Sequence, residues 1–146
     1  MSQVKKINAE ETYAVRQKVL RAGKPIETCY FDGDHDGSTA HFGCIEKQAI
    51  IAVVSVFKCK SNYFEDHTQY QVRGMAVLEI FQKKGFGEQL LNAAEAFCIQ
   101  EKANLIWFNA RETAVLFYKK AGYEVFGAAF TIPSVGIHFV MFKKIK

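Results

Sequence analysis

The chain has 146 residues, of which 49% are hydrophobic and 14% aromatic, and this composition excludes a disordered protein. A chain of this length is expected to form one domain over residues 1–146 with a sizeable core. The net charge of +4 is a mild excess, without the basic runs typical of nucleic-acid binding.

Nothing in the chain indicates a membrane or an export route. No apolar run approaches the roughly 18 to 20 residues that cross a bilayer, and the opening segment MSQVKK lacks the apolar stretch of a signal peptide. The four cysteines (Cys29, Cys44, Cys59 and Cys98) form no CxxC pair, which favours reduced thiols. We therefore expect a cytoplasmic protein that binds neither membrane nor nucleic acid.

The first elements in chain order are an edge strand and a helix. Residues 4–7 alternate in polarity, which predicts the strand, and Asn8 with Glu11 matches a capping box at a helix start. Apolar residues then recur at helical spacing until Gly23, which ends the helix. The polar, glycine-rich segment 31–38 predicts a loop.

A β-hairpin follows the loop, and a strand–turn–helix–strand unit follows the hairpin. Segments 40–46 and 49–58 are rich in β-branched and aromatic residues and are separated by two residues. We predict a strand at 68–77, a helix from 86 to about 102 and a buried strand at 105–109.

The end of the chain predicts one more helix and a closing pair of strands. The helix covers 112–121, with lysines in its last turn and Gly122 as its cap. The strands cover 123–132 and 137–145. This order of elements predicts an α+β domain around a mixed sheet.

The segment QKKGFG at residues 82–87 joins a strand to a helix and suits an anion. Glycines at 85 and 87 let the backbone approach a ligand, and the first amides of the helix lack internal partners. Lys83 and Lys84 add positive charge beside these amides. Taken alone, the segment is equally consistent with an ordinary tight turn, and it matches neither the GxxxxGK[ST] nor the GxGxxG phosphate motif.

Two blocks of sequence together resemble the GNAT (GCN5-related N-acetyltransferase) family. Residues 72–91, VRGMAVLEIFQKKGFGEQLL, are similar to its motif A, in which Gln82, Gly85 and Gly87 fill the defining positions. Residues 117–123, FYKKAGY, are similar to its motif B. The resemblance covers roughly residues 40–145 and implies the acyl-CoA N-acyltransferase fold, with a mixed, mostly antiparallel sheet of about seven strands flanked by helices.

The resemblance implies that acetyl-CoA is the co-substrate and that no metal is needed. The pyrophosphate would lie on the amides of the glycine turn, and the pantetheine arm would pair with the strand before it. The cofactor-binding residues implied in this way are Met75, Ala76, Val77, Gln82, Lys83, Lys84, Gly85, Phe86, Gly87, Glu88, Asn109 and Arg111. Asn109 and Arg111 are equally consistent with cap and surface positions.

Tyr118 matches the tyrosine of the family that faces the sulfur of CoA and acts there as general acid. A thiolate with a pKa of about 8.5 in water leaves the thioester, and a tyrosine with a pKa of about 10 is protonated at neutral pH and can donate to it. The alternative is a tyrosine that only packs in the core on an amphipathic helix.

A base for the attacking amine is harder to identify. Some family members carry a glutamate on the strand before the turn, whereas this chain has Gln71 and Arg73 at the facing positions. Glu79 and His138 are the remaining candidates, and a lone strand histidine is more often structural.

The acceptor is predicted only as a primary amine of a small molecule or peptide. The loop with Asp32, Asp34 and Asp36 lies where the family shapes the acceptor site, so it would either attract a cationic amine or be a solvated surface loop. Position twelve of an EF-hand beginning at Asp32 would be Gly43, which excludes that calcium motif. Histidine spacing gives no metal motif.

Two functions remain open from the sequence. The first is an N-acetyltransferase that joins acetyl-CoA and an amine in a ternary complex. The second is a non-catalytic acyl-CoA-binding or sensing module, which the missing strand glutamate keeps open and Tyr118 disfavours. Edge strands leave a homodimer open as well.

Overall fold

The computed structural model describes residues 3–145, and the expected domain differs from this range only at residues 1–2 and 146, which lie outside it. The elements are β1 (Gln3–Ile7), α1 (Tyr13–Leu20), β2 (Ala40–Glu46), β3 (Ala49–Lys58), β4 (Gln69–Val77), α2 (Phe86–Gln100), β5 (Leu105–Arg111), α3 (Val115–Lys120), β6 (Glu124–Ile132) and β7 (Gly136–Lys144). Four single 3₁₀ turns connect them: η1 (Ala9–Thr12), η2 (Ile26–Cys29), η3 (Glu79–Phe81) and η4 (Glu112–Ala114).

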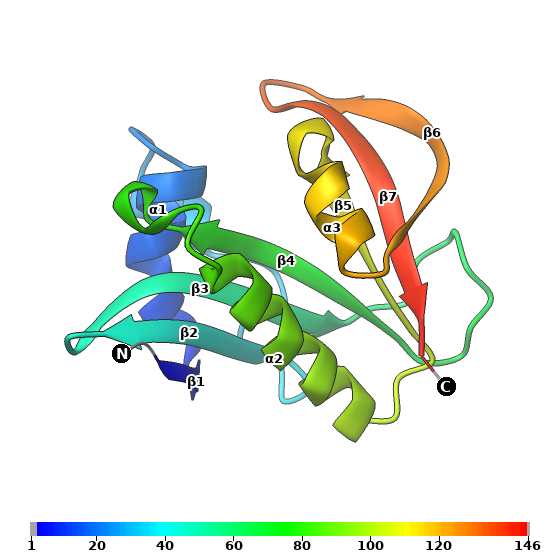
Figure 1. The fold of residues 1–146 in the computed structure, drawn as a ribbon, viewed down its shortest axis with the longest axis horizontal. Helices are drawn as coiled ribbons and strands as arrows, with labels where there is room; N and C mark the ends of the chain where they lie inside the picture. The colour runs from blue at the N-terminus through cyan, green and yellow to red at the C-terminus, as the bar shows by residue number, and fades with distance from the viewer. Residues whose placement is uncertain (1–2, 146) are drawn as a thin grey trace.

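The strands form one seven-stranded sheet in the order β1-β2-β3-β4-β5-β7-β6. Every neighbouring pair is antiparallel except β4 and β5, which confirms the predicted mixed, mostly antiparallel sheet. The parallel pair is short, running only from Gln69 opposite Leu105 to Gln71 opposite Trp107. Beyond these residues β4 and β5 separate, and Figure 1 shows them diverging from the end near the C-terminus.

Helices cover both faces of the sheet, because side chains alternate along each strand. Val53 of β3 packs with Val15 of α1, whereas the adjacent Val54 packs in the core cluster that contains Leu90 of α2. Tyr118 of α3 contacts this second cluster. We call the two sides of the sheet the α1 face and the α2/α3 face (Figure 1).

Local sequence chemistry explains most element ends. The side chain of Asn8 accepts from the amide of Glu11 at 3.0 Å and the side chain of Glu11 accepts from the amide of Asn8 at 2.9 Å, which confirms the capping box. Lys47 and Gln48 both have positive φ, as a two-residue hairpin turn requires. β5 extends to Arg111, two residues beyond the predicted strand, and η4 replaces the first turn of the predicted helix.

A β-bulge interrupts β4 and was not predicted. Arg73 lies opposite Ser55 and Ala76 lies opposite Val53, so residues 74–75 together oppose a single residue of β3. Gly74 has φ of +67°, and a side chain there would meet Phe31 at 3.0 Å. A lone glycine inside a strand pattern is the sequence signal for such a bulge. As a result, Arg73 and Ala76 both face α1, although they are three residues apart.

No helix within residues 3–145 is long and apolar enough to cross a membrane.

Candidate active site

A cleft of about 360 Å³ opens where β4 and β5 separate. Its walls come from β4, β5, the start of α3, the end of α1 and the β6–β7 turn. Side chains from both faces of the sheet line it. Met75, Phe108 and Tyr118 belong to the core of the α2/α3 face. Arg73 and His138 lie on the α1 face, so the cleft passes through the sheet.

The turn before α2 has the backbone geometry of an anion cradle. Lys83 and Gly85 have φ of +62° and +91°, which places two left-handed residues around Lys84. Gly85 is the N-cap of α2 and gives its first turn no side-chain acceptor. The first amides of this 15-residue helix are therefore available to a ligand. The Gln82 side chain donates to the Val77 carbonyl at 2.9 Å and so braces the turn.

Gly87 lies where the start of α2 comes close to α3 and β4. A Cβ at this position would lie 3.5 Å from the ring of Phe117 and 3.8 Å from the sulfur of Met75. Any larger side chain would therefore enter the space between α2, α3 and β4. The glycine turn and the separated edge of β4 thus lie at consecutive positions along one wall of the molecule, as the sequence predicts for a phosphate-bearing extended ligand.

The remaining predicted CoA contacts divide into two groups. Lys83, Lys84 and Glu88 are exposed at the turn. Ala76 and Phe86 are buried with their side chains in the core, so any contact they make with a ligand would come from their backbone.

Tyr118 points into the cleft from α3. Its ring packs on Phe108 with centroids 4.3 Å apart, and its hydroxyl lies 3.9 Å from the sulfur of Met75. Burial raises the pKa of Tyr118 to about 12, so the hydroxyl keeps its proton at neutral pH. A protonated, desolvated hydroxyl at this position can donate a hydrogen bond to a thiolate.

Of the two candidate bases, only His138 lines the cleft. Its side chain is buried, and Nδ1 lies 2.9 Å from the carbonyl oxygen of Gly136, which requires Nδ1 to carry a proton. Nε2 of the neutral ring is then a free acceptor. Glu79 lies in η3 after the end of β4 and is not among the cleft residues.

Gln71, Arg73, Asn109 and Arg111 also line the cleft, all from the α1 face. Asn109 and Arg111 alternate along β5 with Phe108 and Ala110, which belong to the α2/α3 core. Arg111 lies opposite His138 in the β5–β7 ladder, so these two side chains share a face.

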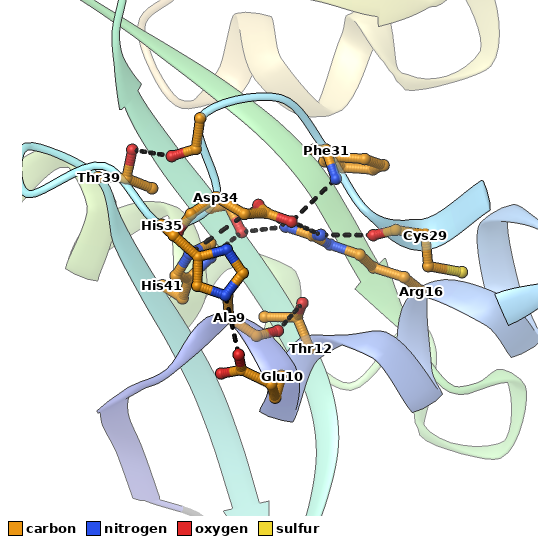
Figure 2. Close-up of polar contacts among 12 residues, drawn as sticks. Ala9, Glu10, Thr12, Arg16, Cys29, Phe31, Asp34, His35, Thr39 and His41 are labelled. Carbon is orange, nitrogen blue, oxygen red and sulfur yellow. Dashed lines mark hydrogen bonds and ion pairs between the residues drawn. The ribbon is translucent and has the colours of Figure 1, made fainter. Parts of the chain in front are cut away.

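The acidic loop is tied to α1 by a buried network, shown in Figure 2. Arg16, which is 0% exposed, binds both carboxylate oxygens of Asp34 at 2.8 and 3.0 Å and also donates to Cys29 and Ser55. The ring of His41 bridges the hydroxyl of Ser55 and the carbonyl of Asp34. Asp34 is therefore buried and paired, so the expectation of a solvated surface loop is wrong for this residue. Asp32 and Asp36 are exposed and lie outside the cleft.

Two site residues escaped the sequence analysis: Arg21 at the end of α1 and Phe31 in the loop, both of which line the cleft. No motif marks them, because α1 and the loop reach the site only through the fold. Within residues 3–145, no group of three His, Cys, Asp or Glu side chains could hold a metal ion.

Comparison with known proteins connects this geometry to a family. The family model described as "Acetyltransferase (GNAT) domain" matches residues 17–146. An uncharacterized N-acetyltransferase of Bacillus subtilis (strain 168), YitI, is 32% identical over 146 residues, which cover 100% of this chain and 98% of that protein.

Solved structures show the same fold at low sequence identity. A putative N-acetyltransferase from Lactobacillus plantarum superposes with a TM-score of 0.78 at 18% identity, covering 98% of this chain and 97% of the other. Arabidopsis thaliana NAA60, in complex with a bisubstrate analogue, superposes with a TM-score of 0.78 at 12% identity, covering 99% and 98%.

Proposed function

Because the chain belongs to the GNAT acetyltransferase family, we propose that it transfers the acetyl group of acetyl-CoA to the primary amine of a small molecule or peptide in a ternary complex. Acetyl-CoA is the usual co-substrate of this family and amines are its acceptors. The observation that carries the proposal is the position of Tyr118, whose protonated hydroxyl lies in the same cleft as the free edge of β4.

The two substrates would approach from opposite faces of the sheet. The amides at the start of α2 would hold the pyrophosphate, and the edge of β4 beyond the bulge would pair with the pantetheine arm. This brings the thioester beside Met75 and Tyr118, on the α2/α3 face. The amine would enter from the α1 face, beside Arg73 and His138, and meet the thioester carbonyl within the cleft.

His138 would accept the proton of the incoming ammonium group through Nε2. Deprotonating an alkylamine of pKa about 10.4 at pH 7 costs roughly 4 to 5 kcal/mol, so a base or a water chain beside it accelerates attack. The amine nitrogen bonds to the carbonyl carbon, and the C–S bond breaks. The thiolate takes the electron pair of this bond.

Tyr118 would stabilise the departing thiolate mainly as a hydrogen-bond donor. With a pKa of about 12 for the hydroxyl against about 8.5 for a thiol in water, full proton transfer would be uphill by roughly 5 kcal/mol. Desolvation of the thiolate narrows this gap, because it raises the proton affinity of the sulfur. The ammonium group gives up two protons in all. His138 passes the first to solvent, and the second, which the nitrogen loses as the amide forms, goes to the thiolate, so that CoA leaves as a thiol.

The test is thiol release from acetyl-CoA in the presence of a panel of amines, with binding of acetyl-CoA measured in parallel. We expect acetyl-CoA to bind and at least one class of amine to release CoA thiol. Tight binding of acetyl-CoA without turnover of any amine would favour the non-catalytic acyl-CoA-binding module instead, provided that Tyr118→Phe also leaves that binding unchanged.

A further inference from the structure

Arginines supply the positive charge that lines the cleft. The sequence contains four, and three of them, Arg21, Arg73 and Arg111, line the cleft, whereas no lysine does. The fourth, Arg16, lies directly behind Phe31. No Asp or Glu of residues 3–145 is among the lining residues. The lining of the cleft therefore carries guanidinium groups without carboxylates.

Phe31 holds three of these guanidinium groups close together. The guanidinium carbons of Arg16, Arg73 and Arg21 lie 3.8, 4.6 and 5.7 Å from the centroid of its ring. Arg73 also lies 5.5 Å from the centroid of Phe57. Stacking on aromatic rings leaves the edges of a guanidinium, with their N–H donors, free for a ligand.

The one buried carboxylate nearby does not neutralise this group. Oδ2 of Asp34 accepts from Arg16 at 2.8 Å and from the amide of Phe31 at 2.9 Å, and Oδ1 accepts from Arg16 at 3.0 Å. Asp34 thus forms its close ion pair with Arg16 (Figure 2). Two positive charges, those of Arg21 and Arg73, remain around Phe31.

Arg73 is the least compensated of them. It is half-buried, and its side chain has no ion pair or hydrogen bond with any other residue from 3 to 145. Burial lowers the pKa of Arg73, and the neighbouring charge of Arg16 lowers it further. Five donors on a partly desolvated cation facing a cleft are the arrangement in which proteins bind carboxylate or phosphate.

These groups lie on the α1 face, away from the predicted CoA cradle. The turn at Gly85 follows the far end of β4, and Tyr118 approaches the cleft from the α2/α3 face. The arginine cluster therefore lies on the same face of the cleft as His138, the face from which the amine would enter. A cleft of about 360 Å³ that also admits the acetyl group leaves room for a small acceptor.

We propose that the acceptor is a small primary amine that also carries an oxyanionic group, a carboxylate or a phosphate, which binds Arg73 and Arg21 while the amine faces His138. This inference rests on the proposed acetyl transfer and names the class of acceptor for it. It also reverses the expectation of an acidic acceptor site that attracts a cationic amine.

The experiment compares matched amines. Amino acids with two to five carbons are set against their carboxamides, phosphoethanolamine against ethanolamine, and 1,3-diaminopropane serves as the cationic case. We expect kcat/KM to be at least tenfold higher for one anionic series than for its neutral partners, and lowest for the diamine. The two anionic series separate carboxylate from phosphate.

Substitutions then test the residues. Arg73→Met keeps an apolar chain against Phe31, and we expect it to lower the anionic-to-neutral ratio of kcat/KM about 10- to 100-fold, with Arg73→Lys in between. Arg21→Met is the second variant, with a smaller loss, in case Arg73→Met does not fold. Lys18→Met removes an exposed charge from the same helix as its matched control and leaves the ratio unchanged.

The outcomes separate this inference from the proposed function. Turnover of neutral or cationic amines at the rate of anionic ones overturns the inference and leaves acetyl transfer intact. Weaker acetyl-CoA binding in Arg73→Met with an intact anion preference also overturns it, because the arginine then serves the donor. Acetyl-CoA binding without turnover of any amine overturns both.

Discussion

The two faces of the cleft are built in different ways. On the α2/α3 face, a contiguous segment from β4 through the glycine turn into α2 supplies backbone groups, and α3 adds Tyr118. On the α1 face, five separate segments supply side chains: α1, the 31–38 loop, β4, β5 and β7. The first face uses backbone amides that any sequence with the right glycines can offer. The second depends on which side chains the fold brings together.

This difference suggests that features common to the family lie on the α2/α3 face and that features particular to this chain lie on the α1 face. A cradle of amides and one tyrosine suits a donor common to a whole family. Arg21 and Arg73, which lie around Phe31 in the cleft, would suit a particular acceptor. Substitutions on the α2/α3 face should therefore alter acetyl-CoA binding or thiolate departure, whereas substitutions on the α1 face should alter stability or turnover of the amine. The following predictions test that difference.

The largest effect is expected for Asp34→Asn, which leaves Arg16 buried without its counter-charge. We expect a loss of about 3 to 5 kcal/mol in the free energy of unfolding and a fall of roughly 10 °C in Tm, measured by thermal denaturation. Asp32→Asn, an exposed aspartate of the same loop, is the control and should lie within about 0.5 kcal/mol of the wild type.

The Asp34 effect also depends on pH. Burial alone would raise the pKa of Asp34, but the hydrogen bonds from Arg16 and Phe31 and the charge of Arg16 outweigh it, so the pKa is lowered. The stabilisation is therefore complete above about pH 4, the unfolded value, and is lost as the pH falls through the lower folded value. Melting curves in which the variant stays equally far below the wild type in stronger acid would contradict this account.

Tyr118→Phe is expected to lower kcat by about 100- to 1000-fold, because it removes the donor to the thiolate. Acetyl-CoA affinity should change less than threefold, since the ring still packs on Phe108. Steady-state kinetics and calorimetric titration measure the two quantities. An equal loss in affinity and rate would mean that the hydroxyl serves binding rather than chemistry.

His138→Gln is expected to lower kcat/KM for the amine about 100-fold at pH 7. The deficit should shrink as the pH approaches 10, where the amine loses its own proton. His67→Gln, at an exposed histidine, is the matched control and should leave kcat/KM unchanged. A deficit that is constant with pH would indicate a packing role for His138.

Gly87→Val is expected to weaken acetyl-CoA binding about tenfold, because the branched side chain would enter the space between Phe117 and Met75. Gly37→Val is the control, since a Cβ at Gly37 meets no atom within 4 Å and its φ is not positive. Titration with acetyl-CoA measures both. Unchanged affinity in Gly87→Val would mean that the pantetheine arm runs elsewhere.

The sequence predicted the fold well, because the signals for its elements are local. The capping box at Asn8, the hairpin turn at Lys47 and the strand–glycine turn–helix around Gly85 depend on neighbours within a few residues. Their physical causes are backbone conformation and hydrogen bonds within a turn. The structure accordingly contains these elements with ends shifted by only a few residues.

The side-chain contacts on the α1 face of the cleft could not be predicted, because they join distant parts of the chain. Asp34 is paired with Arg16, 18 residues earlier, and no spacing rule links them. Arg73 was noted in the sequence only because it stands where some family members carry a glutamate. Its partner ring, Phe31, lies in a loop without a motif. The bulge at Gly74, which turns Arg73 and Ala76 to the same face, had a signal in the lone strand glycine.

The short parallel ladder between β4 and β5 has a mechanical consequence. Only three residue pairs join the two strands. The antiparallel unit β1–β4 and the antiparallel unit β5–β7 are therefore connected within the sheet by one short ladder. We expect the two units to move relative to each other more readily than strands do within either unit, and this motion would change the width of the cleft. A ligand that touches both units should damp this motion, and amide hydrogen exchange at Gln71 and Trp107 should slow when the cleft is filled.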